Sequence, residues 1–423
     1  MSSWSSSESL LDCLGPVAPP LNFSDQQWQL LLDDADRRRL LPMLYPRIGQ
    51  AAPPQPRDRL RRAYLATGAR NMHLYAQLEQ ILASLNAQHI DIIVLKGACL
   101  AREIYSDIAL RPMGDIDLLA QSADLPKILD CLASVGYASS SRDTIEQQVA
   151  AGQHLEALTR GGEFPIELHH HIELPNSPFT VDVAGLWQRR RFIKVGDCNA
   201  SMLGAEDLVL HLCLHAVRHA RRDWYDNYAM KSVCDITQTT RALAVNWDLL
   251  VNRAISWRAE RPIFLVLTLA RQWLGADIPT EPLESLRPAD FRPQVIDWAR
   301  EQFLSPIQSV EPIGIHAARM LGSETPQKRL AILLKRFFPP LHEIRGQYGL
   351  PPDSPWVWAC YPLRFSQLLV RDAPAIWRYW RGDLRMGAAA RHAANTQKFR
   401  QWLTGSSSHP DDRHRRDTAG TVD

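Results

Sequence analysis

Two short segments in the first third of the chain have the hydrophobic pattern of strands. The apolar run at 92–95 (IIVL) is rich in β-branched residues and is followed by Lys96-Gly97, which favours a buried strand over a helix. In the segment 115–119, acidic and apolar residues alternate. Because the side chains of a strand point alternately to its two faces, Asp115 and Asp117 are expected on the same face.

A similar alternation occurs further along the chain, at 164–169. Phe164, Ile166 and Leu168 fall on one face of the predicted strand, whereas Glu167 and His169 fall on the other. The spacing predicts that the last two residues point the same way. A further short strand is expected near 192–195.

Helical periodicity surrounds these predicted strands. Apolar residues recur at three- and four-residue intervals from about 57 to 88 and again from 124 to 135, after which Gly136 is suited to end a helix. Ser24-Asp25 has the composition of a helix start. Helix, strand, helix, strand and helix in succession predict an α+β fold, with a small mixed sheet flanked by helices.

The remainder of the chain is read as mostly helical. Helical patterns dominate from about Gly204, and the aromatic-rich residues 354–402 are expected to pack onto a core. Residues 1–20 and the tail are rich in small and polar residues, so we expect them to be loose. The predicted organisation is a flexible N-terminus with a short helical segment (1–56), an α/β core (57–175), a connector (176–200), a helical domain (201–402) and a disordered tail (403–423).

The composition is ordinary for a globular protein. The chain has 423 residues, of which 45% are hydrophobic, and its net charge of +2 gives no support for a nucleic-acid partner. Its 7 cysteines are dispersed without a C-x-x-C pair, which indicates reduced thiols in a cytoplasm. No run approaches the roughly 18 apolar residues that span a bilayer, and no secretory signal is evident, so no membrane association is expected.

The acidic pair of the second strand suggests a metal site. Two carboxylates on one face repel each other, and a hard cation such as Mg²⁺, which binds one or two carboxylates together with waters and substrate phosphates, removes that cost. Gly97 would let the backbone approach a phosphate, and Lys96 would supply a positive charge. The combination indicates a nucleoside triphosphate beside a metal-carrying strand. For an isolated D-x-D the alternative is a solvated edge strand.

Several motifs along the chain carry a family resemblance. They are LKGACLAREIYSD, RPMGDIDLLA, LASVGY and IELHHHIE, followed by LGAEDLVLHLCLHAVRHARRDW, SVCDI, NWDLLV and LARQWLGADIP. Together they resemble the uncharacterised bacterial nucleotidyltransferases of the DNA-polymerase-β-like superfamily, over roughly residues 60–385. The chain departs from the superfamily pattern at Gly97-Ala98, where Gly-Ser or Gly-Gly is usual, so that no hydroxyl is available there for a phosphate.

The resemblance implies a nucleotidyltransferase core at 57–175. Glu167 would be the third metal carboxylate, on a strand beside that of Asp115 and Asp117. The resemblance further implies two Mg²⁺ ions, an NTP as co-substrate, and transfer of a nucleoside monophosphate to a small-molecule, peptide or protein acceptor. The alternative function is a non-catalytic module that binds a nucleotide or a partner and keeps the fold.

Three further residues are candidates for phosphate binding. Lys96, Gly97 and Arg111 lie on either side of the helix that follows the first strand. The alternatives are a surface role for Lys96 and, for Arg111, helix capping or pairing with an acidic group.

The histidines can be interpreted as zinc ligands or as packing residues. His211, His215 and His219 recur at four-residue steps, and His169-His170-His171 follows Glu167. Zinc binding is one interpretation, but no H-E-x-x-H pattern completes it, and packing within a helical domain is the interpretation that we favour. His169 is the exception, because it shares a face with Glu167 and is placed to orient it. In the family resemblance, histidines recur near His154 and His215, which suggests a place near the acceptor.

Overall fold

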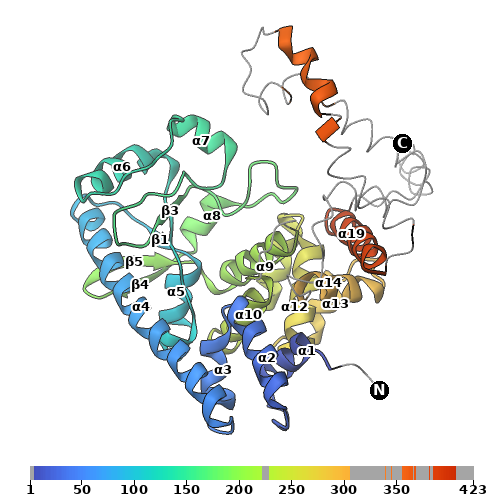
Figure 1. Cartoon of the computed structure of the whole chain (residues 1–423). Coiled ribbons are helices and arrows are strands. Elements are labelled where there is room, and N and C mark those ends of the chain that lie inside the picture. Colours follow the sequence, from blue (N-terminus) through green and yellow to red (C-terminus); the bar gives the residue numbers. More distant parts are fainter. Residues whose placement is uncertain are drawn as a thin grey trace, which may run out of the picture. The chain divides into compact units, whose positions relative to one another are not determined.

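The structure of the chain is a computed structural model (Figure 1). It describes residues 4–221, 228–304, 339, 344, 355–364, 366–367, 381 and 384–405. The chain forms two compact units, of which the first comprises Met1–Ala220 and Asp226–Arg292, and the second comprises Arg221–Tyr225 and Pro293–Asp423. The predicted boundaries at 175, 200 and 402 stay predictions. Within the described residues, no helix is long and apolar enough to span a membrane.

The centre of the first unit is a mixed sheet of five strands, in the order β3-β2-β1-β5-β4. The strands are β1 (Ile93–Val94), β2 (Ile116–Leu119), β3 (Ile166–His169), β4 (Arg191–Val195) and β5 (Cys198–Met202). β2 pairs with β3 in parallel and with β1 in antiparallel orientation, while β5 pairs with β1 in parallel and with β4 in antiparallel orientation. This sheet, with its surrounding helices, confirms the predicted α+β fold.

The predicted strands are present, and one further strand was missed. The segments predicted at 92–95, 115–119, 164–169 and 192–195 contain β1, β2, β3 and β4. β5 was not predicted, because Cys-Asn-Ala-Ser-Met contains none of the β-branched or aromatic residues that mark strands. The segment 176–200, expected to be a connector with one short strand, therefore contains β4 and the beginning of β5.

Helices cover the sheet and position its strands. The 34-residue helix α4 (Pro54–Ala87) buries Leu74, Leu78 and Leu85, as its periodicity predicted, and Figure 1 shows it running beside the sheet. α5 (Lys96–Glu103) directly follows β1, and the 3₁₀ turn η1 (Ile108–Leu110) leads towards β2. The predicted helix at 124–135 is preceded by the 3₁₀ turn η2 (Ser122–Asp124) and is α6 (Leu125–Ser134), and Gly136 with φ of 89° follows its end. The shorter helices α7 (Ile145–Ala151) and α8 (Val183–Gln188) precede β3 and β4.

The N-terminal region is more ordered than the sequence suggested. It folds into α1 (Ser6–Leu14), α2 (Asp25–Arg37) and α3 (Leu41–Ile48), and Ser24 forms a capping box with Gln27 at the predicted start of α2. Instead of being loose, α1 packs against its neighbours through the apolar side chains of Leu10, Leu11, Cys13 and Leu14. The reason is a helical apolar face that the surrounding serines concealed in the sequence.

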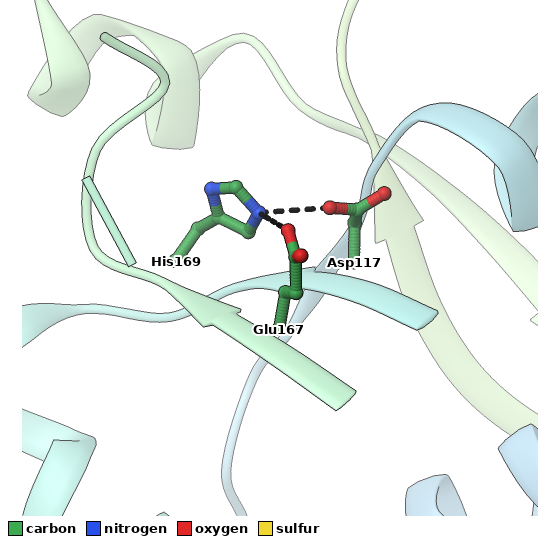
Figure 2. A group of neighbouring side chains, drawn as sticks. All are labelled: Asp117, Glu167 and His169. Atoms are coloured by element: carbon green, nitrogen blue, oxygen red, sulfur yellow. Dashed lines mark hydrogen bonds and ion pairs between the residues drawn. The ribbon is translucent and has the colours of Figure 1, made fainter. Parts of the chain in front are cut away.

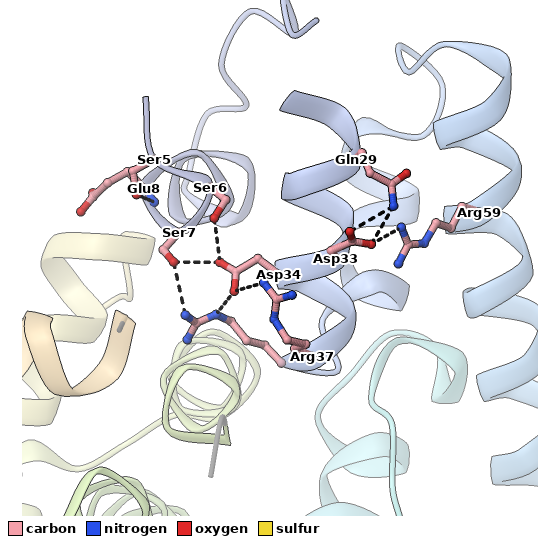
Figure 3. Close-up of polar contacts among 10 residues, drawn as sticks. Ser5, Ser6, Ser7, Glu8, Gln29, Asp33, Asp34, Arg37 and Arg59 are labelled. Carbon is pink, nitrogen blue, oxygen red and sulfur yellow. Dashed lines mark hydrogen bonds and ion pairs between the residues drawn. The ribbon is translucent and has the colours of Figure 1, made fainter. Parts of the chain in front are cut away.

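Buried polar contacts also hold α1 against α2 (Figure 3). Asp34, only 1% exposed, accepts a hydrogen bond from the Ser7 hydroxyl at 2.8 Å. Its carboxylate also accepts from Arg38 Nε at 3.1 Å. The preceding residue, Asp33, accepts from Arg59 of α4 at 2.7 Å. The bonds to Asp34 compensate the burial of its charge, which would otherwise be costly.

The helical region predicted from 201 is distributed over both units. α9 (Ala205–Arg221) begins in the first unit, which also contains α10 (Tyr228–Ala242), α11 (Trp247–Ser256), α12 (Glu260–Leu274) and α13 (Thr280–Leu286). In the second unit, α14 (Gln294–Leu304), the 3₁₀ turn η3 (Pro355–Trp358) and α19 (Leu384–Leu403) are described. Much of the aromatic-rich segment at 354–402, and the tail from 406, lie outside the described residues.

Candidate metal and nucleotide site

The register between β2 and β3 brings the predicted acidic residues together. Asp117 lies directly opposite Glu167, and Leu119 lies opposite His169, in a parallel pair. Because residues in register point to the same face, the carboxylates of Asp117 and Glu167 are neighbours. This confirms the prediction that the strand of Glu167 lies beside the aspartate strand.

Asp117, Glu167 and His169 form a compact cluster of candidate ligand atoms (Figure 2). One donor atom from each lies within 4.8 Å of the other two. His169 Nε2 is 2.8 Å from Asp117 Oδ1 and 3.5 Å from Glu167 Oε2, so the imidazole contacts both carboxylates. Within the described part of the chain, this is the only such cluster of three histidine, cysteine or acidic side chains.

Asp117 is held as an anion by two nitrogen donors. Its carboxylate is buried, and Oδ1 accepts a hydrogen bond from Lys96 Nζ at 2.6 Å in addition to that from His169. Burial alone would raise the pKa of Asp117, but the positive charge of Lys96 and the bond to His169 outweigh it and hold the pKa well below its usual range.

Lys96 begins α5 with an unusual backbone conformation. Its φ is 42°, a left-handed value that costs a residue with a Cβ free energy. Its side chain is 12% exposed and reaches back across the sheet to Asp117. The strain at this position is therefore associated with the residue that contacts the acidic cluster.

Asp115 lies just before β2, outside the three-residue cluster but within its electrostatic field. Burial raises its pKa, and the negative charges of Asp117 and Glu167 raise it further, while Lys96 and Lys231 act in the opposite direction. Asp115 is thus the carboxylate that is least stable as an anion when no cation is bound.

Glu167 is the most accessible member of the cluster. Its side chain is 27% exposed, and its pKa is lowered chiefly by the hydrogen bond to His169, against the effects of burial and Asp117. His154 Nε2 lies 3.8 Å from Glu167 Oε2, and the rings of His154 and His169 are 4.9 Å apart. Two histidines therefore border the carboxylate, including the one predicted to orient it.

Arg111 is placed in a buried ion pair with Asp235 of α10. Its Nε and Nη2 donate to the two carboxylate oxygens at 3.0 and 2.8 Å, and the Tyr105 hydroxyl donates to the same group at 2.7 Å. Burial lowers the pKa of Arg111, but Asp235 outweighs it and raises the pKa. Pairing with an acidic group was the alternative interpretation of this arginine. Gly97 lies against it, since a Cβ there would come within 3.1 Å of Arg111 Nη1.

Two groups of α10 near the site were not singled out from the sequence, namely Asp235 and Lys231, whose charge acts on Asp115. A third nearby group, His211 of α9, is 1% exposed. Burial lowers the pKa of His211 well below its ordinary value, and the nearby charge of Lys96 lowers it further. More than 90 residues separate these groups from β2, so no local pattern could connect them; His211 was noted only for its helical spacing.

The histidines of α9 form no metal cluster in the part of the chain that is described. The rings of His211 and His215 are 6.2 Å apart in an edge-to-face arrangement, which suits packing within a helical region. The side chain of His219 lies outside the described residues.

The comparison with known families decides the assignment. Residues 24–275 match a family described as uncharacterised nucleotidyltransferase. The chain belongs to this nucleotidyltransferase family. The match includes β1 to β5 and the acidic residues Asp115, Asp117 and Glu167, as well as Lys231 and Asp235.

Other comparisons add little to the family assignment. No curated protein matches the chain. Among solved structures, the chain is similar to an antigenic nucleotidyltransferase-like protein from Paracoccidioides brasiliensis, with 16% identity over 48% of this chain and 93% of that chain. The TM-score of this match is 0.29.

Proposed function

We propose that this nucleotidyltransferase transfers a nucleoside monophosphate from an NTP to a hydroxyl-bearing acceptor, with divalent metal ions as cofactor. The observation that carries the proposal is the parallel register that sets Asp117 opposite Glu167, on strands whose sequences resemble the family motifs. Two Mg²⁺ ions, held with the help of Asp115, are the cofactor that we propose, and a small molecule, peptide or protein is the proposed acceptor.

The donor atoms of the site fit a divalent cation. Two carboxylates and an imidazole converge within 4.8 Å, and carboxylate oxygens are the ligands that Mg²⁺ prefers. The raised pKa of Asp115 fits as well, because a nearby cation would relieve the repulsion from Asp117 and Glu167. When bound, such ions supply positive charge to the triphosphate and lower the pKa of the acceptor hydroxyl.

The residues of the chain would contribute mainly by position and charge. Glu167, the most exposed carboxylate, is the group best placed to meet the acceptor, and His169 would keep it oriented. Lys96 would release Asp117 to the metal and turn its ammonium group towards phosphate oxygens, as predicted from the sequence. Preorganised charges of this kind supply most of the catalysis in phosphoryl-type transfer.

Gly97 and Arg111 would stabilise the loop next to the proposed phosphate site. The absence of a Cβ at Gly97 permits the close approach of Arg111 and Met113. Since Arg111 is engaged with Asp235, its predicted contact with phosphate stays a prediction, and its observed role is to hold the loop before β2.

A second candidate function follows from a specific contact. Asp117 Oδ1 already accepts hydrogen bonds from Lys96 and His169, so the buried carboxylate is compensated without a metal ion. This arrangement is compatible with a protein that binds nucleotides or a partner without catalysis.

A transfer assay separates the two functions. Each NTP, labelled at the α-phosphate, is incubated with Mg²⁺, a cell extract as the source of acceptor, and the wild type, Glu167→Gln or Asp117→Asn. Label in a macromolecule or small molecule and released pyrophosphate, both lost in the two variants, support transfer. Asp130→Asn, which changes an exposed carboxylate on α6, is the matched control. Calorimetric binding of an NTP without any transfer would favour the non-catalytic module instead.

A further inference from the structure

A cavity in the first unit lies apart from the acidic cluster. It contains about 680 Å³ of space that is not filled by atoms, a volume that includes open solvent. Helices α1, α3, α10 and α12 and the segment from Tyr105 to Leu110 surround it. None of Asp117, Glu167 and His169 lines it.

The polar lining of this cavity is positively charged. Arg47 of α3 and Arg241 of α10 both line it, with Ser106, Thr237 and Gln238, and among the described residues no carboxylate does. After burial, the charge of Arg241 is the largest influence that lowers the pKa of Arg47, so the two guanidinium groups repel each other. Two like charges that face the same space without an acidic partner would be stabilised by an anion.

Both arginines are fixed in place yet keep donors available. Arg47 donates from Nε to the Cys13 carbonyl at 2.8 Å and from Nη2 to the Gly15 carbonyl, and Arg241 donates from Nη2 to the Leu274 and Gly275 carbonyls at 2.9 and 3.0 Å. Within the described residues, Nη1 of each arginine has no acceptor. Held guanidinium groups with free N–H donors are suited to carboxylate or phosphate oxygens.

The rest of the lining is apolar. Leu14, Met43, Pro46, Leu110 and Leu274 contribute it, and the first two are 8% and 7% exposed. A ligand that fits both parts has an anionic head and a short apolar body. We propose that this cavity binds a small molecule with one phosphate or carboxylate group, held between Arg47 and Arg241.

The cavity also adjoins the network that supports the candidate active site. Tyr105 lines the cavity, and its hydroxyl donates to Asp235, which holds Arg111. The proposal does not depend on the transfer reaction, because it concerns a different set of residues.

Fluorine NMR of the full chain tests the proposal with two probes, 4-fluorophenyl phosphate and 4-fluorobenzoate. We expect the wild type to bind at least one of them, and the stronger probe distinguishes a phosphate site from a carboxylate site. Arg47→Gln and Arg241→Gln should each weaken binding about tenfold or more, since each removes charge-assisted hydrogen bonds.

Three further variants test whether the probes bind in this cavity. Gln238→Trp fills the cavity while it leaves both arginines and their carbonyl bonds unchanged, and should abolish binding. Arg57→Gln removes another exposed arginine that donates to backbone carbonyls, and Lys96→Gln removes the cation of the acidic cluster; both should bind as the wild type does. Failure of both probes to bind, binding that survives Gln238→Trp, or binding lost in Lys96→Gln would overturn the proposal.

Discussion

At the residue scale, the site is governed by how three neighbouring carboxylates share a small number of cations. Asp117 has taken both Lys96 and His169 as partners, and its pKa is accordingly lowered. Asp115 has no comparable hydrogen bond among those described, and its pKa is raised by burial and by its acidic neighbours. In the absence of metal, Asp115 is therefore expected to cost stability at neutral pH.

Asp115→Asn should stabilise the metal-free protein at pH 7. A carboxyl whose folded-state pKa is raised costs nothing below its unfolded-state value near 3.8, and the full cost is present above the folded-state pKa. The gain in unfolding free energy should be on the order of 1 kcal/mol. Urea denaturation in EDTA at pH 7 and pH 4 measures it.

The gain should shrink at pH 4, where Asp115 is closer to its protonated form in the wild type. Asp130→Asn is the control, because that carboxylate is exposed on α6 and should show little change at either pH. A loss of stability at pH 7 for Asp115→Asn, or an equal gain at both values, would contradict this account of the site.

The sequence predicted the positions of some site residues but not all of their contacts. Alternation alone predicted that Glu167 and His169 share a face, and that Asp115 and Asp117 do, because parity within a strand is a local property. That the two pairs lie on neighbouring strands came from the family resemblance. The bond between Lys96 and Asp117 was not predicted, since a backbone with φ of 42° at a lysine has no sequence signal.

At the scale of elements, α10 is tied to the segment between α5 and β2. Asp235 accepts from both Arg111 and Tyr105, and the three side chains are buried. Removing one partner of a buried ion pair leaves the other uncompensated. Asp235→Asn should therefore lower the unfolding free energy by about 3–5 kcal/mol, measured by chemical denaturation.

The control for this prediction is Asp290→Asn, which breaks an ion pair with Arg261 near the surface. Its side chain is 43% exposed, so the cost should stay below about 1 kcal/mol. Equal effects of the two substitutions would show that burial of the Asp235 pair has no special weight.

Gly97 links α5 to the same segment. A Cβ at this position would lie 3.1 Å from Arg111 Nη1 and 3.1 Å from Met113 Cγ, closer than most real contacts. Gly97→Ala should therefore displace the loop that leads to Asp115 and weaken metal binding several-fold, as calorimetry would measure. Ala101→Gly, at a buried position on the same helix, separates this effect from a general loss of helix stability. Unchanged metal affinity in Gly97→Ala would mean that the close approach has no functional consequence.

Elements with strong local signals were predicted, and those that depend on tertiary contacts were not. The periodicity of α4 and the capping box of α2 each depend on residues that are close together in the sequence. β5 lacks strand-forming residues and exists because β1 and β4 offer it hydrogen-bonding partners on either side. The packing of α10 against Arg111 likewise depends on a contact between two residues that are 124 positions apart in the sequence.

At the scale of the whole molecule, the family match falls almost entirely within the first unit. Residues 24–275 belong to that unit except for 221–225. A chain that ends at Arg292 should therefore fold cooperatively and bind divalent metal with an affinity within about twofold of the full chain. Circular dichroism melting and Mn²⁺ titration would measure the two properties. Loss of metal binding by a folded shortened chain would show that the second unit contributes to the site.

The central claim is that Asp117 and Glu167, paired across β2 and β3, bind a divalent cation. Electron paramagnetic resonance of Mn²⁺, with a non-hydrolysable NTP present, tests it most directly by counting bound ions in the full chain. We predict saturable binding that weakens roughly tenfold or more in Asp117→Asn and in Glu167→Gln and is unchanged in Asp130→Asn. Binding of equal strength in all four proteins, or no binding in the wild type, would contradict the claim.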